Sequence, residues 1–401
     1  MINFIYNCVI IGEGERMQQA GFQKQVLLVM GKRYIDRVHR GVAEYAREKG
    51  WHLTNLFGYD AGLIRSRQCD GVIASLEPND PLTEDVLSMR RPTVDLSIAR
   101  EDSDLVHLTG DNRAMGRAAA RHFMDRGFRN YVWFSEGNHT AAQLRREGYE
   151  NELGKHGFAC QSLVVTDRFS AEKPTWASLN QWLVENLREM PEPCAVYAYN
   201  DVQAADLLSV CAAGGIRVPD EVAVLGTDNH PLICPTAAIP LSSINHDLEA
   251  LGRRAAEELD RMMTGVLVEA RVIEVPHRGI TIRQSSDVYA INDPHLVRAL
   301  RFIQTHYSLN IGVRDVVAAV EISRRPLERR FQQHLQRSIH GQLNHLRLGS
   351  VCRLLRETSS SIAVIAAASG FSTPEYLHRV FLKHMQTTPR RYRLEHAEYH
   401  D

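Results

Sequence analysis

The 401-residue sequence has few cysteines, and they form no pair at redox or metal-binding spacing. The seven cysteines are scattered and odd in number, which argues against a disulfide framework and for reduced thiols. No stretch approaches the roughly 20 consecutive apolar residues of a membrane helix. The apolar run near the N-terminus is short, is broken by Asn7 and lacks the basic region of a secretory signal. We therefore predict a cytoplasmic protein with no metal site and no membrane partner.

Motifs that mark an enzyme are also missing. The sequence has no P-loop, no GxSxG elbow and no HExxH pair, so nothing identifies a nucleophile or a metal centre. Gly12 and Gly14 begin a GxGxxG motif, but Met17 occupies the third glycine position, and we reject a dinucleotide-binding interpretation. We predict a protein that is not an enzyme, with no catalytic residue and no cofactor.

Charge is nearly balanced overall but unevenly distributed. The chain has a net charge of −1, whereas residues 294–401 contain 16 Lys and Arg against 8 Asp and Glu, a net charge of +8 that leaves −9 on residues 1–293. Clustered basic residues attract phosphates irrespective of sequence, and an acidic remainder discourages non-specific wrapping. This asymmetry is typical of a DNA-binding C-terminal segment.

Residues Val316–Phe331 have the pattern of a helix-turn-helix unit. Ser323 is placed to cap the second helix, and Leu327 and Phe331 recur four residues apart on its buried side. Its exposed face would carry Arg324, Arg325, Glu328 and Arg329. Such a helix can enter the major groove, because a bidentate guanidinium matches the two acceptors of guanine. We predict that the three arginines contact base edges and that Glu328 accepts from cytosine.

A second unit of the same kind spans Ile365–Phe381. Gly370 is expected to end its first helix, and the stretch from Ser372 to Glu375 predicts a capping box for the next. The outward residues of that helix are Thr373, Tyr376, His378 and Arg379. All but Tyr376 are our candidates for base contacts. Polar faces alone decide nothing, but two units in tandem favour DNA binding over a pair of solvated helices.

Between the two units, Gln342–Glu357 has apolar residues at helical spacing, with Arg347, Arg353 and Arg356 expected at the surface. Such a helix, about 24 Å long, suits recognition helices held about one duplex turn, roughly 34 Å, apart. The run from Ile303 to Tyr392, above all SIAVIAAASGFSTPEYLHRVFLKHMQTTPRRYR, resembles the arabinose-regulator (AraC/XylS) DNA-binding domain. The resemblance implies that double-stranded operator DNA is a partner.

Upstream of this region, strand patterns alternate with helix patterns. The first set is Gln25–Met30, Tyr34–Lys49, Gly71–Ser75, Thr83–Met89, Thr93–Leu96, Leu105–Thr109 and Asn112–Arg126. The second set is Tyr131–Phe134, Ala141–Lys155, Ser162–Val165, Thr175–Glu189, Ala195–Ala198, Val202–Ala213 and Val222–Gly226. Such alternation predicts parallel sheets covered by helices on both faces, and two successive sets predict two lobes. A ligand is then expected in the cleft between the lobes, beyond the carboxyl ends of the strands.

Several stretches of this body resemble a known sugar-binding domain. YAYNDVQAADLLSVCAAGGIRVPDEVAVLGTDN, PLSSI, DNRAMGRAAARHFMDRGFRNYVWF and RREGY are similar to the periplasmic-binding-protein-like domain of lactose/galactose repressors, over about residues 25–285. Followed by an AraC/XylS domain, such a body has the order found in xylose-operon regulators, which the chain from Lys24 onward resembles. The resemblance implies an α/β two-lobe periplasmic-binding-protein-like fold with two doubly wound parallel sheets, followed by an all-α tandem helix-turn-helix domain. It also implies a pentose-like sugar effector, a homodimer and, for an activator, RNA polymerase as a partner.

Sugar chemistry indicates which residues matter. A pyranose presents hydroxyls that both donate and accept, so its site needs carboxylates, amides and arginine on the rim and an apolar face against the C–H surface. By matching motifs, Arg145 of RREGY should bind hydroxyls, and Asp228 of GTDN should accept from the sugar. Asn200 and Asp201 should lie after a strand of the second lobe.

The remaining candidates are in the first lobe and in turns. Tyr34, in the turn after the first strand, is expected to close the site together with Asp36 and Arg37. Asn229 and Asp111 fit turn or helix-cap roles better than ligand contacts.

Two positions differ from the related regulators. Asp36 stands where arginine is common, and Ala141 stands where tryptophan is common. Losing a stacking ring and exchanging a cation for a carboxylate changes both the face and the rim of a sugar site. Arg33 or Arg37 could supply the missing cation. The resemblance favours an activator of genes for pentose use, and a repressor of the same architecture for a sugar other than xylose is the alternative.

We predict four segments: an N-terminal extension at residues 1–23, poorly ordered or upstream of a true start at Met17; a two-lobe regulatory domain at 24–285; a linker at 286–294; and a DNA-binding domain at 295–401. Sugar binding would favour a closed state and reposition the DNA-binding domains of a dimer. Two alternatives stay open: an α/β enzyme acting on a small sugar or nucleotide, and a plain sugar receptor, which would need an export signal and no DNA-binding tail.

Overall fold

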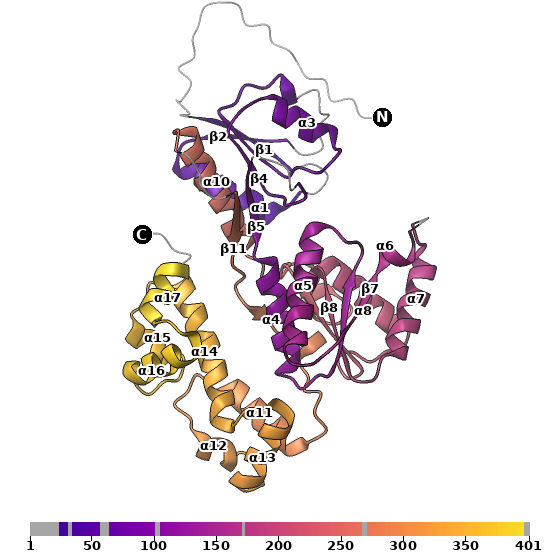
Figure 1. Ribbon diagram of the computed structural model, residues 1–401, viewed down its shortest axis with the longest axis vertical. Coiled ribbons are helices and arrows are strands. Elements are labelled where there is room, and N and C mark those ends of the chain that lie inside the picture. The colour runs from indigo at the N-terminus through magenta and orange to yellow at the C-terminus, as the bar shows by residue number, and fades with distance from the viewer. Residues whose placement is uncertain are drawn as a thin grey trace, which may run out of the picture. The chain divides into compact units, whose positions relative to one another are not determined.

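A computed structural model describes residues 24–30, 34–56, 64–100, 105–170, 173–266 and 271–396 (Figure 1). The predicted extension at 1–23, with Met17, and the alternative cation Arg33 lie outside the described residues. The chain divides into two units, and it crosses between them near residues 108, 250 and 273. The first unit takes the chain up to Leu108 together with Leu251–Ile273, and the second takes Thr109–Ala250 and the remainder. The two predicted sets had suggested that the lobes follow one another in the sequence. The structure differs, because the first unit also takes in residues 251–273.

The first unit is built on a sheet with the strand order β11-β5-β4-β3-β1-β2. Its strands are β1 (Gln25–Val29), β2 (His52–Asn55), β3 (Gly71–Ala74), β4 (Thr93–Asp95), β5 (Val106–Gly110) and β11 (Val272–Val275). Its helices are α1 (Asp36–Glu48), α3 (Pro81–Ser88) and α10 (Leu248–Met263). A Cβ on Gly252 would lie 2.0 Å from the Val38 carbonyl oxygen, so α10 packs directly on α1.

The second unit contains a sheet with the order β12-β10-β9-β8-β6-β7, parallel except for the antiparallel pair of β10 and β12. Its strands are β6 (Asn130–Ser135), β7 (Cys160–Val164), β8 (Cys194–Ala198), β9 (Val222–Thr227), β10 (Ser242–Ile244) and β12 (Ile280–Thr281). Its α/β helices are α4 (Asn112–Met124), α5 (Thr140–Gly154), α6 (Val165–Arg168), α7 (Trp176–Glu189), α8 (Asp201–Ala213) and α9 (Ile233–Thr236).

Strand β6 shows how the sequence places two cores. Tyr131 and Trp133 pack with the residues of α4 and α5, whereas Val132 and Phe134 pack with those of α7 and α8. Successive side chains of a strand point to opposite faces, so one run of large apolar residues serves both layers. The expected doubly wound arrangement of parallel strands is confirmed.

Glycines let α4 and α5 cross in close contact. A Cβ on Gly116 would lie 2.1 Å from the Arg145 carbonyl oxygen, and one on Gly148 would lie 2.2 Å from that of Arg113. These distances are far below van der Waals contact, so a larger residue would separate the two helices. The crossing holds the backbone of Arg145 beside the first turn of α4.

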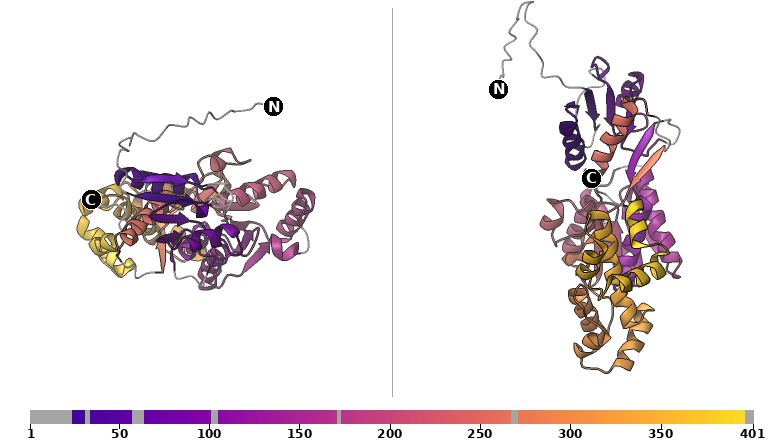
Figure 2. Two further views of the ribbon diagram at one scale, coloured as in Figure 1. Left: turned by 90° about the horizontal axis from the view of Figure 1, so that it is seen from above. Right: turned by 90° about the vertical axis from the view of Figure 1, so that its left-hand side faces the viewer.

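The C-terminal part of the second unit is helical after the short 3₁₀ helix η1 (Gln284–Ser286), and Figure 2 shows it in orange to yellow from two further directions. Its helices are α11 (Pro294–His306), α12 (Val313–Ala318), α13 (Arg324–Leu335), α14 (Ile339–Glu357), α15 (Ile362–Ala368), α16 (Pro374–Met385) and α17 (Pro389–His396). Helix α14 belongs to two cores, because Ile339 and Leu343 pack with α11 to α13, whereas Leu348, Val351 and Leu355 pack with α15 and α16.

No helix among the described residues is long and apolar enough to span a membrane.

One surface prediction is wrong. Arg347 is only 4% exposed, and its guanidinium donates to the carbonyl oxygens of Tyr307 (2.9 Å), Leu309 (2.8 Å) and Ile311 (2.8 Å). Helical periodicity placed this arginine opposite the apolar stripe, but the loop after α11 covers it. Carbonyl acceptors make its burial tolerable, since a buried cation needs hydrogen-bond partners. Arg347 ties the first helix-turn-helix unit to the shared helix.

Helix ends differ from the predictions by a few residues. Thr373, not Ser372, is the N-cap of α16 and accepts a hydrogen bond from the Tyr376 amide. Helix α14 begins at Ile339, three residues before the predicted start. Gly370 follows the end of α15 with φ +77°, which agrees with its predicted role, because glycine adopts this conformation without steric cost.

Candidate functional site

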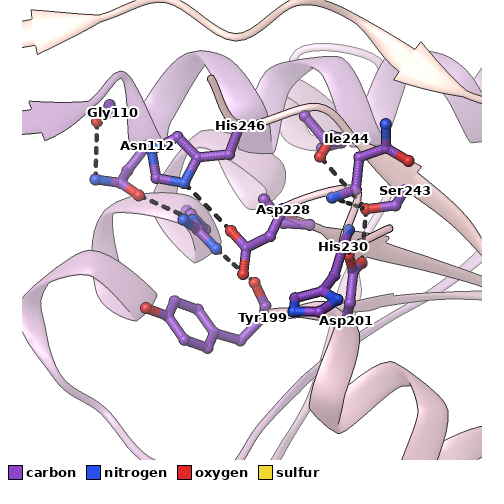
Figure 3. Close-up of polar contacts among 12 residues, drawn as sticks. Gly110, Asn112, Tyr199, Asp201, Asp228, His230, Ser243, Ile244 and His246 are labelled. Atoms are coloured by element: carbon purple, nitrogen blue, oxygen red, sulfur yellow. Dashed lines mark hydrogen bonds and ion pairs between the residues drawn. The ribbon is translucent and has the colours of Figure 1, made fainter. Parts of the chain in front are cut away.

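Polar side chains gather at the carboxyl ends of the strands in the second sheet (Figure 3). Tyr199 and Asp201 follow β8, Asp228 follows β9, and His246 follows β10. Carboxyl ends of parallel strands meet at one edge of a sheet, where the backbone leaves room for a ligand. The structure thus brings candidates that are well separated in sequence into one cluster.

Arg145 reaches this cluster from α5. Its Nε donates to Asn112 Oδ1 (2.8 Å), its Nη1 donates to the Tyr199 carbonyl oxygen (2.6 Å), and its guanidinium lies 4.6 Å from the centre of the Tyr199 ring. Burial by itself would lower the pKa of Arg145. The nearby Tyr199, Tyr197 and Asp228 have the larger combined effect, and they raise this pKa. The guanidinium is therefore a fixed, charged donor, 3% exposed.

Asn112 is itself held in place. Its Nδ2 donates to Thr109 Oγ1 (3.1 Å) and to the Gly110 carbonyl oxygen (2.9 Å). Because the amide nitrogen is used in this way, the amide oxygen faces Arg145. The first turn of α4 is part of the cluster, which the motif DNRAMG had not assigned to the site.

Asp228 and His246 form a pair in which the carboxylate is partly exposed and the imidazole is buried. Asp228 Oδ1 lies 3.2 Å from His246 Nδ1, and the Asp228 side chain is 28% exposed. Asp228 has φ +109°, a conformation that costs a non-glycine residue free energy and often marks functional sites. Gly110 makes room for the imidazole, because a Cβ there would lie 2.4 Å from His246 Nε2. A carboxylate and an imidazole here can exchange hydrogen bonds with hydroxyls.

Asp201 and Asn200 have structural partners. Asp201 accepts hydrogen bonds from Ser243 Oγ (2.6 Å), the His230 amide (2.7 Å) and Cys234 Sγ (3.2 Å), and it is 1% exposed. Burial, and next the charge of Asp228, raise the pKa of Asp201 to about 7. Asn200 caps α8 by accepting from the Gln203 amide (3.0 Å). In Figure 3, Asp201 and Asp228 belong to separate groups of hydrogen bonds.

Asp111 and Asn229 have the turn and cap roles that we favoured for them. Asp111 is the N-cap of α4 and accepts from the Ala114 amide (2.7 Å). Asn229, with φ +49°, accepts from Arg283 Nη2 (2.9 Å).

The three first-lobe candidates lie at the start of α1, in the first unit. The Tyr34 hydroxyl bonds His39 Nδ1 (2.6 Å), and Tyr34 is 42% exposed. Asp36 is exposed in the first turn of α1, and Arg37 is half-buried. Their participation in a ligand site stays a prediction.

Sequence reasoning did not select Asn112, Tyr199 and His246. Tyr199 directly precedes the predicted Asn200, and His246 comes two residues after the stretch PLSSI, which carried part of the resemblance. All polar residues that closely follow a buried strand of a parallel sheet are candidates for a ligand site, and this criterion would have selected Tyr199 and His246.

Helix α13 presents most of the predicted readout residues of the first helix-turn-helix unit. Arg324, Arg325 and Arg329 are exposed, and the side chain of Arg324 is 67% exposed. Glu328 instead accepts from the Ile339 amide at the start of α14 (3.1 Å) and lies 3.8 Å from Arg324. Glu328 therefore holds the α13–α14 turn, which leaves the arginines as the better candidates for base contacts.

Helix α16 is similar in the second unit. Thr373, His378 and Arg379 are exposed. The Tyr376 hydroxyl bonds His340 Nε2 (2.9 Å) of α14, and the Arg379 guanidinium lies 5.4 Å from the Tyr376 ring centre. Tyr376 thus connects the recognition helix of one unit to the helix shared by both.

Two known domain families match this chain. A periplasmic binding protein-like domain matches residues 120–286, and a helix-turn-helix domain matches residues 316–395. The first match covers Arg145 of α5 and the strand ends followed by Asp228 and His246, and the second covers α13 and α16.

Relatives with both parts are similar over nearly the whole chain. The xylose operon regulatory protein of Haemophilus influenzae is 26% identical, over 93% of this chain and 98% of its own length. That of Escherichia coli K12 is 26% identical, over 93% and 97%. Among solved structures, the xylose-binding transcription activator xylR is 25% identical, with a TM-score of 0.57 over 94% of this chain and all of the other. The transcriptional regulator CelR in complex with cellobiose, 23% identical with a TM-score of 0.55 over 65% and 84%, shares the fold.

Proposed function

We propose that this chain, a DNA-binding transcriptional regulator that joins a periplasmic-binding-protein-like domain to a C-terminal tandem helix-turn-helix domain, responds to a small sugar held by Arg145 and Asp228. Such a regulator works in the cytoplasm, where its operator DNA is. Its partners are the sugar, the operator, a second copy of the chain and, as an activator, RNA polymerase. It carries out no catalysis.

The observation that carries the proposal is the polar cluster at the strand ends. Arg145 supplies a fixed cationic donor, Asp228 a partly open carboxylate, and His246 a ring that both donates and accepts. The Tyr199 ring adds an aromatic surface beside the guanidinium. A neutral polyol needs this combination of donors, acceptors and an aromatic face.

We infer that the effector is a pentose close to xylose and that the protein activates genes for its use. The xylose-regulator relatives over nearly the full length support this inference. Ala141 and Asp36 replace residues common in such regulators, so a second sugar of similar shape is the alternative, with repression in place of activation.

A thermal-shift screen tests the sugar site. Purified protein is heated with xylose, arabinose, ribose, glucose, galactose and sugar phosphates. One sugar should raise the melting temperature of the wild type, because a ligand that binds only the folded state stabilises it by mass action. Asp228→Ala should abolish the shift.

The matched control is Asp220→Ala, which removes an exposed acid from the turn before β9 and should keep the full shift. If every sugar leaves the wild type unshifted, or if Asp228→Ala responds like the wild type, the proposed effector site is wrong. Once the stabilising sugar is known, an operator duplex is selected from random DNA. Its dissociation constant, measured with and without the sugar, then shows whether the sugar strengthens or weakens DNA binding.

A further inference from the structure

Helix α4 begins at the effector cluster and ends at the DNA-binding part of the same unit. Asn112, its first residue, bonds Arg145, and Asp125, its C-cap, follows its last residue. The helix has 13 residues and is about 20 Å long. Its close glycine crossing packs it tightly against α5.

Asp125 is bound by two residues of the helix-turn-helix domain. Its carboxylate accepts from the guanidinium of Arg337, in the turn after α13, and from His345 Nε2 of α14 (2.7 Å). Next to it, Arg129 Nη2 donates to the His334 carbonyl oxygen (2.7 Å) in the last turn of α13. We call these contacts, made by Asp125 and Arg129 with His334, Arg337 and His345, the α4 clamp. They hold the C-terminal end of the first recognition helix.

The segment that we expected to be a linker is packed against the same turn. The Ala290 amide donates to the Arg126 carbonyl oxygen (2.8 Å), and Arg126 Nε donates to the Ser286 carbonyl oxygen (3.1 Å). Gly127, with φ +83°, leaves space for Ile291, because a Cβ there would lie 2.5 Å from Ile291 Cγ1. Ile291 in turn belongs to the core of the first helix-turn-helix unit. The connection is therefore short and anchored at both ends.

Electrostatics favour a charged clamp. Burial opposes ionisation of Asp125, but the hydrogen bond from His345 and the charge of Arg337 hold its pKa well below the usual range. A largely desolvated carboxylate with two partners depends on them more strongly than an exposed ion pair does. Loss of the carboxylate would leave Arg337 and His345 without this acceptor.

A pocket borders the clamp. A cavity of about 430 Å³ lies beside the clamp, and its lining includes Arg121, Met124, Glu152, Phe158, Leu335 and Gln336. A junction with such a cavity lacks the continuous apolar packing of a core, and polar junctions of this kind permit movement between domains. The orientation of the junction consequently rests on the anchored segment 286–291 and on a few directional contacts, of which Asp125 makes two.

We propose that Asp125 is a positioning residue: through Arg337 and His345 it fixes α13 to the sugar-binding lobe, so that the effector state reaches the first recognition helix through α4. The transmission of a sugar signal rests on the proposed function. The effect of the α4 clamp on DNA binding does not, because it can be measured without sugar. Coupling of this kind requires an element that both sites bias. Helix α4 qualifies, because its two ends contact Arg145 and Arg337.

The test compares full-length Asp125→Ala and Asp125→Asn with wild type. Three quantities are measured: sugar affinity, the dissociation constant for a selected operator without and with sugar, and amide hydrogen exchange in residues 286–293 and 334–345. Effector coupling is typically 5- to 150-fold. Both variants should bind sugar within about twofold of wild type, but the ratio of the two operator constants should fall toward 1, and exchange at the clamp should speed up.

Glu150→Ala is the matched control, because it removes an acid whose ion-pair partner, Arg146, lies on the same helix. It should behave as wild type in all three measurements. Arg337→Ala should lower the ratio in the same direction as Asp125→Ala does. The double variant should add little to Asp125→Ala, since the Arg337–Asp125 contact is already lost in that variant.

The outcomes separate the two proposals. A wild type whose operator affinity ignores every sugar contradicts the proposed sugar response; the clamp is then judged by hydrogen exchange and sugar-free operator affinity. If the Asp125 variants leave both of these unchanged, or keep a wild-type ratio in a sugar-responsive protein, the clamp proposal is wrong. Because Asp125→Asn removes only the charge, it tests the idea even if Asp125→Ala does not fold.

Discussion

At the scale of single residues, the polar cluster at the strand ends of the second sheet contains two carboxylates in different environments. Asp228 is partly open beside His246, whereas Asp201 is buried and accepts hydrogen bonds from three donors in β10 and in the segment after β9. Both were predicted as ligand contacts from their position after a strand. Position could not separate them, because the difference comes from Ser243 and the turn at His230, which only the folded chain places next to Asp201.

Asp201 predicts a pH dependence of stability. Its pKa rises from the ordinary value of 3.8 to about 7 in the folded protein, first through burial and then through Asp228. The folded protein therefore holds this proton more tightly than the unfolded chain does. The stability contributed by Asp201 is full below about pH 4, falls as the pH rises to about 7, and is constant above.

Urea unfolding of wild type and Asp201→Asn at pH 5, 6, 7 and 8 measures this effect. The variant cannot ionise, so its stability relative to wild type should increase from pH 5 to pH 8, whatever constant offset the amide introduces. Asp220→Asn, at an exposed position, should follow the wild type. An equal pH response in wild type and Asp201→Asn would show that Asp201 does not titrate in this range.

At the scale of elements, the two helix-turn-helix units are joined into one body by the shared helix α14. Arg347 of this helix binds three carbonyl oxygens of the loop after α11, and Gly370 packs against the same loop. The Tyr376 to His340 hydrogen bond connects α16 to the start of α14. A fixed relation between the recognition helices is what two successive major-groove segments require.

Gly370→Ala should disrupt this junction. The residue has φ +77°, and a Cβ would lie 2.2 Å from the Tyr307 carbonyl oxygen. A left-handed conformation alone costs alanine roughly 1–2 kcal/mol, and the backbone contact adds to it. We expect a lower melting temperature and weaker operator binding, measured by calorimetry and fluorescence anisotropy.

Gly349→Ala is the control for this substitution. Gly349 lies in the middle of α14, and a Cβ there would meet nothing within 4 Å. Alanine in a helix interior is favoured over glycine by about 1 kcal/mol, so this variant should be slightly stabilised and bind operator normally. Equal behaviour of the two variants would mean that Gly370 does not hold the units together.

At the scale of the whole molecule, charge separates the two tasks of the chain. Residues 294–401 carry +8 and residues 1–293 carry −9. Affinity for DNA should accordingly fall steeply with salt, because neutralised phosphates release counterions. The acidic part should contribute little to non-specific binding.

Arg325→Ala should weaken operator binding by roughly 1–3 kcal/mol and relax specificity at one base pair, as expected for a lost base contact. Its thermal shift with sugar should be that of the wild type. Arg217→Ala, which removes an exposed arginine paired with Glu221 in the second lobe, is the control and should leave operator binding unchanged. An Arg325→Ala variant with unaltered affinity and specificity would remove this residue from the interface.

Much of the architecture follows from the sequence itself. The alternation of strand and helix patterns predicted the parallel sheets, because the spacing of apolar residues is a local property of the chain. The tandem helix-turn-helix units, with Gly370 at the end of α15 and the exposed arginines of α13, followed from periodicity and capping residues. The motifs RREGY and GTDN predicted Arg145 and Asp228 as ligand contacts, and the structure brings Arg145 of α5 and Asp228, which follows β9, into one polar cluster. Their contact with a ligand stays a prediction.

Only the tertiary structure decided how distant segments meet. It assigned α10 to the first unit, buried Arg347 under a loop, and gave Glu328 and Tyr376 partners on α14. It also placed His246 against Asp228, and Arg337 and His345 against Asp125, more than 200 positions away. The periodicity of apolar residues indicates which face of a helix or strand is buried. Contacts between elements depend on how distant segments of the chain pack together, and no local sequence pattern contains that information.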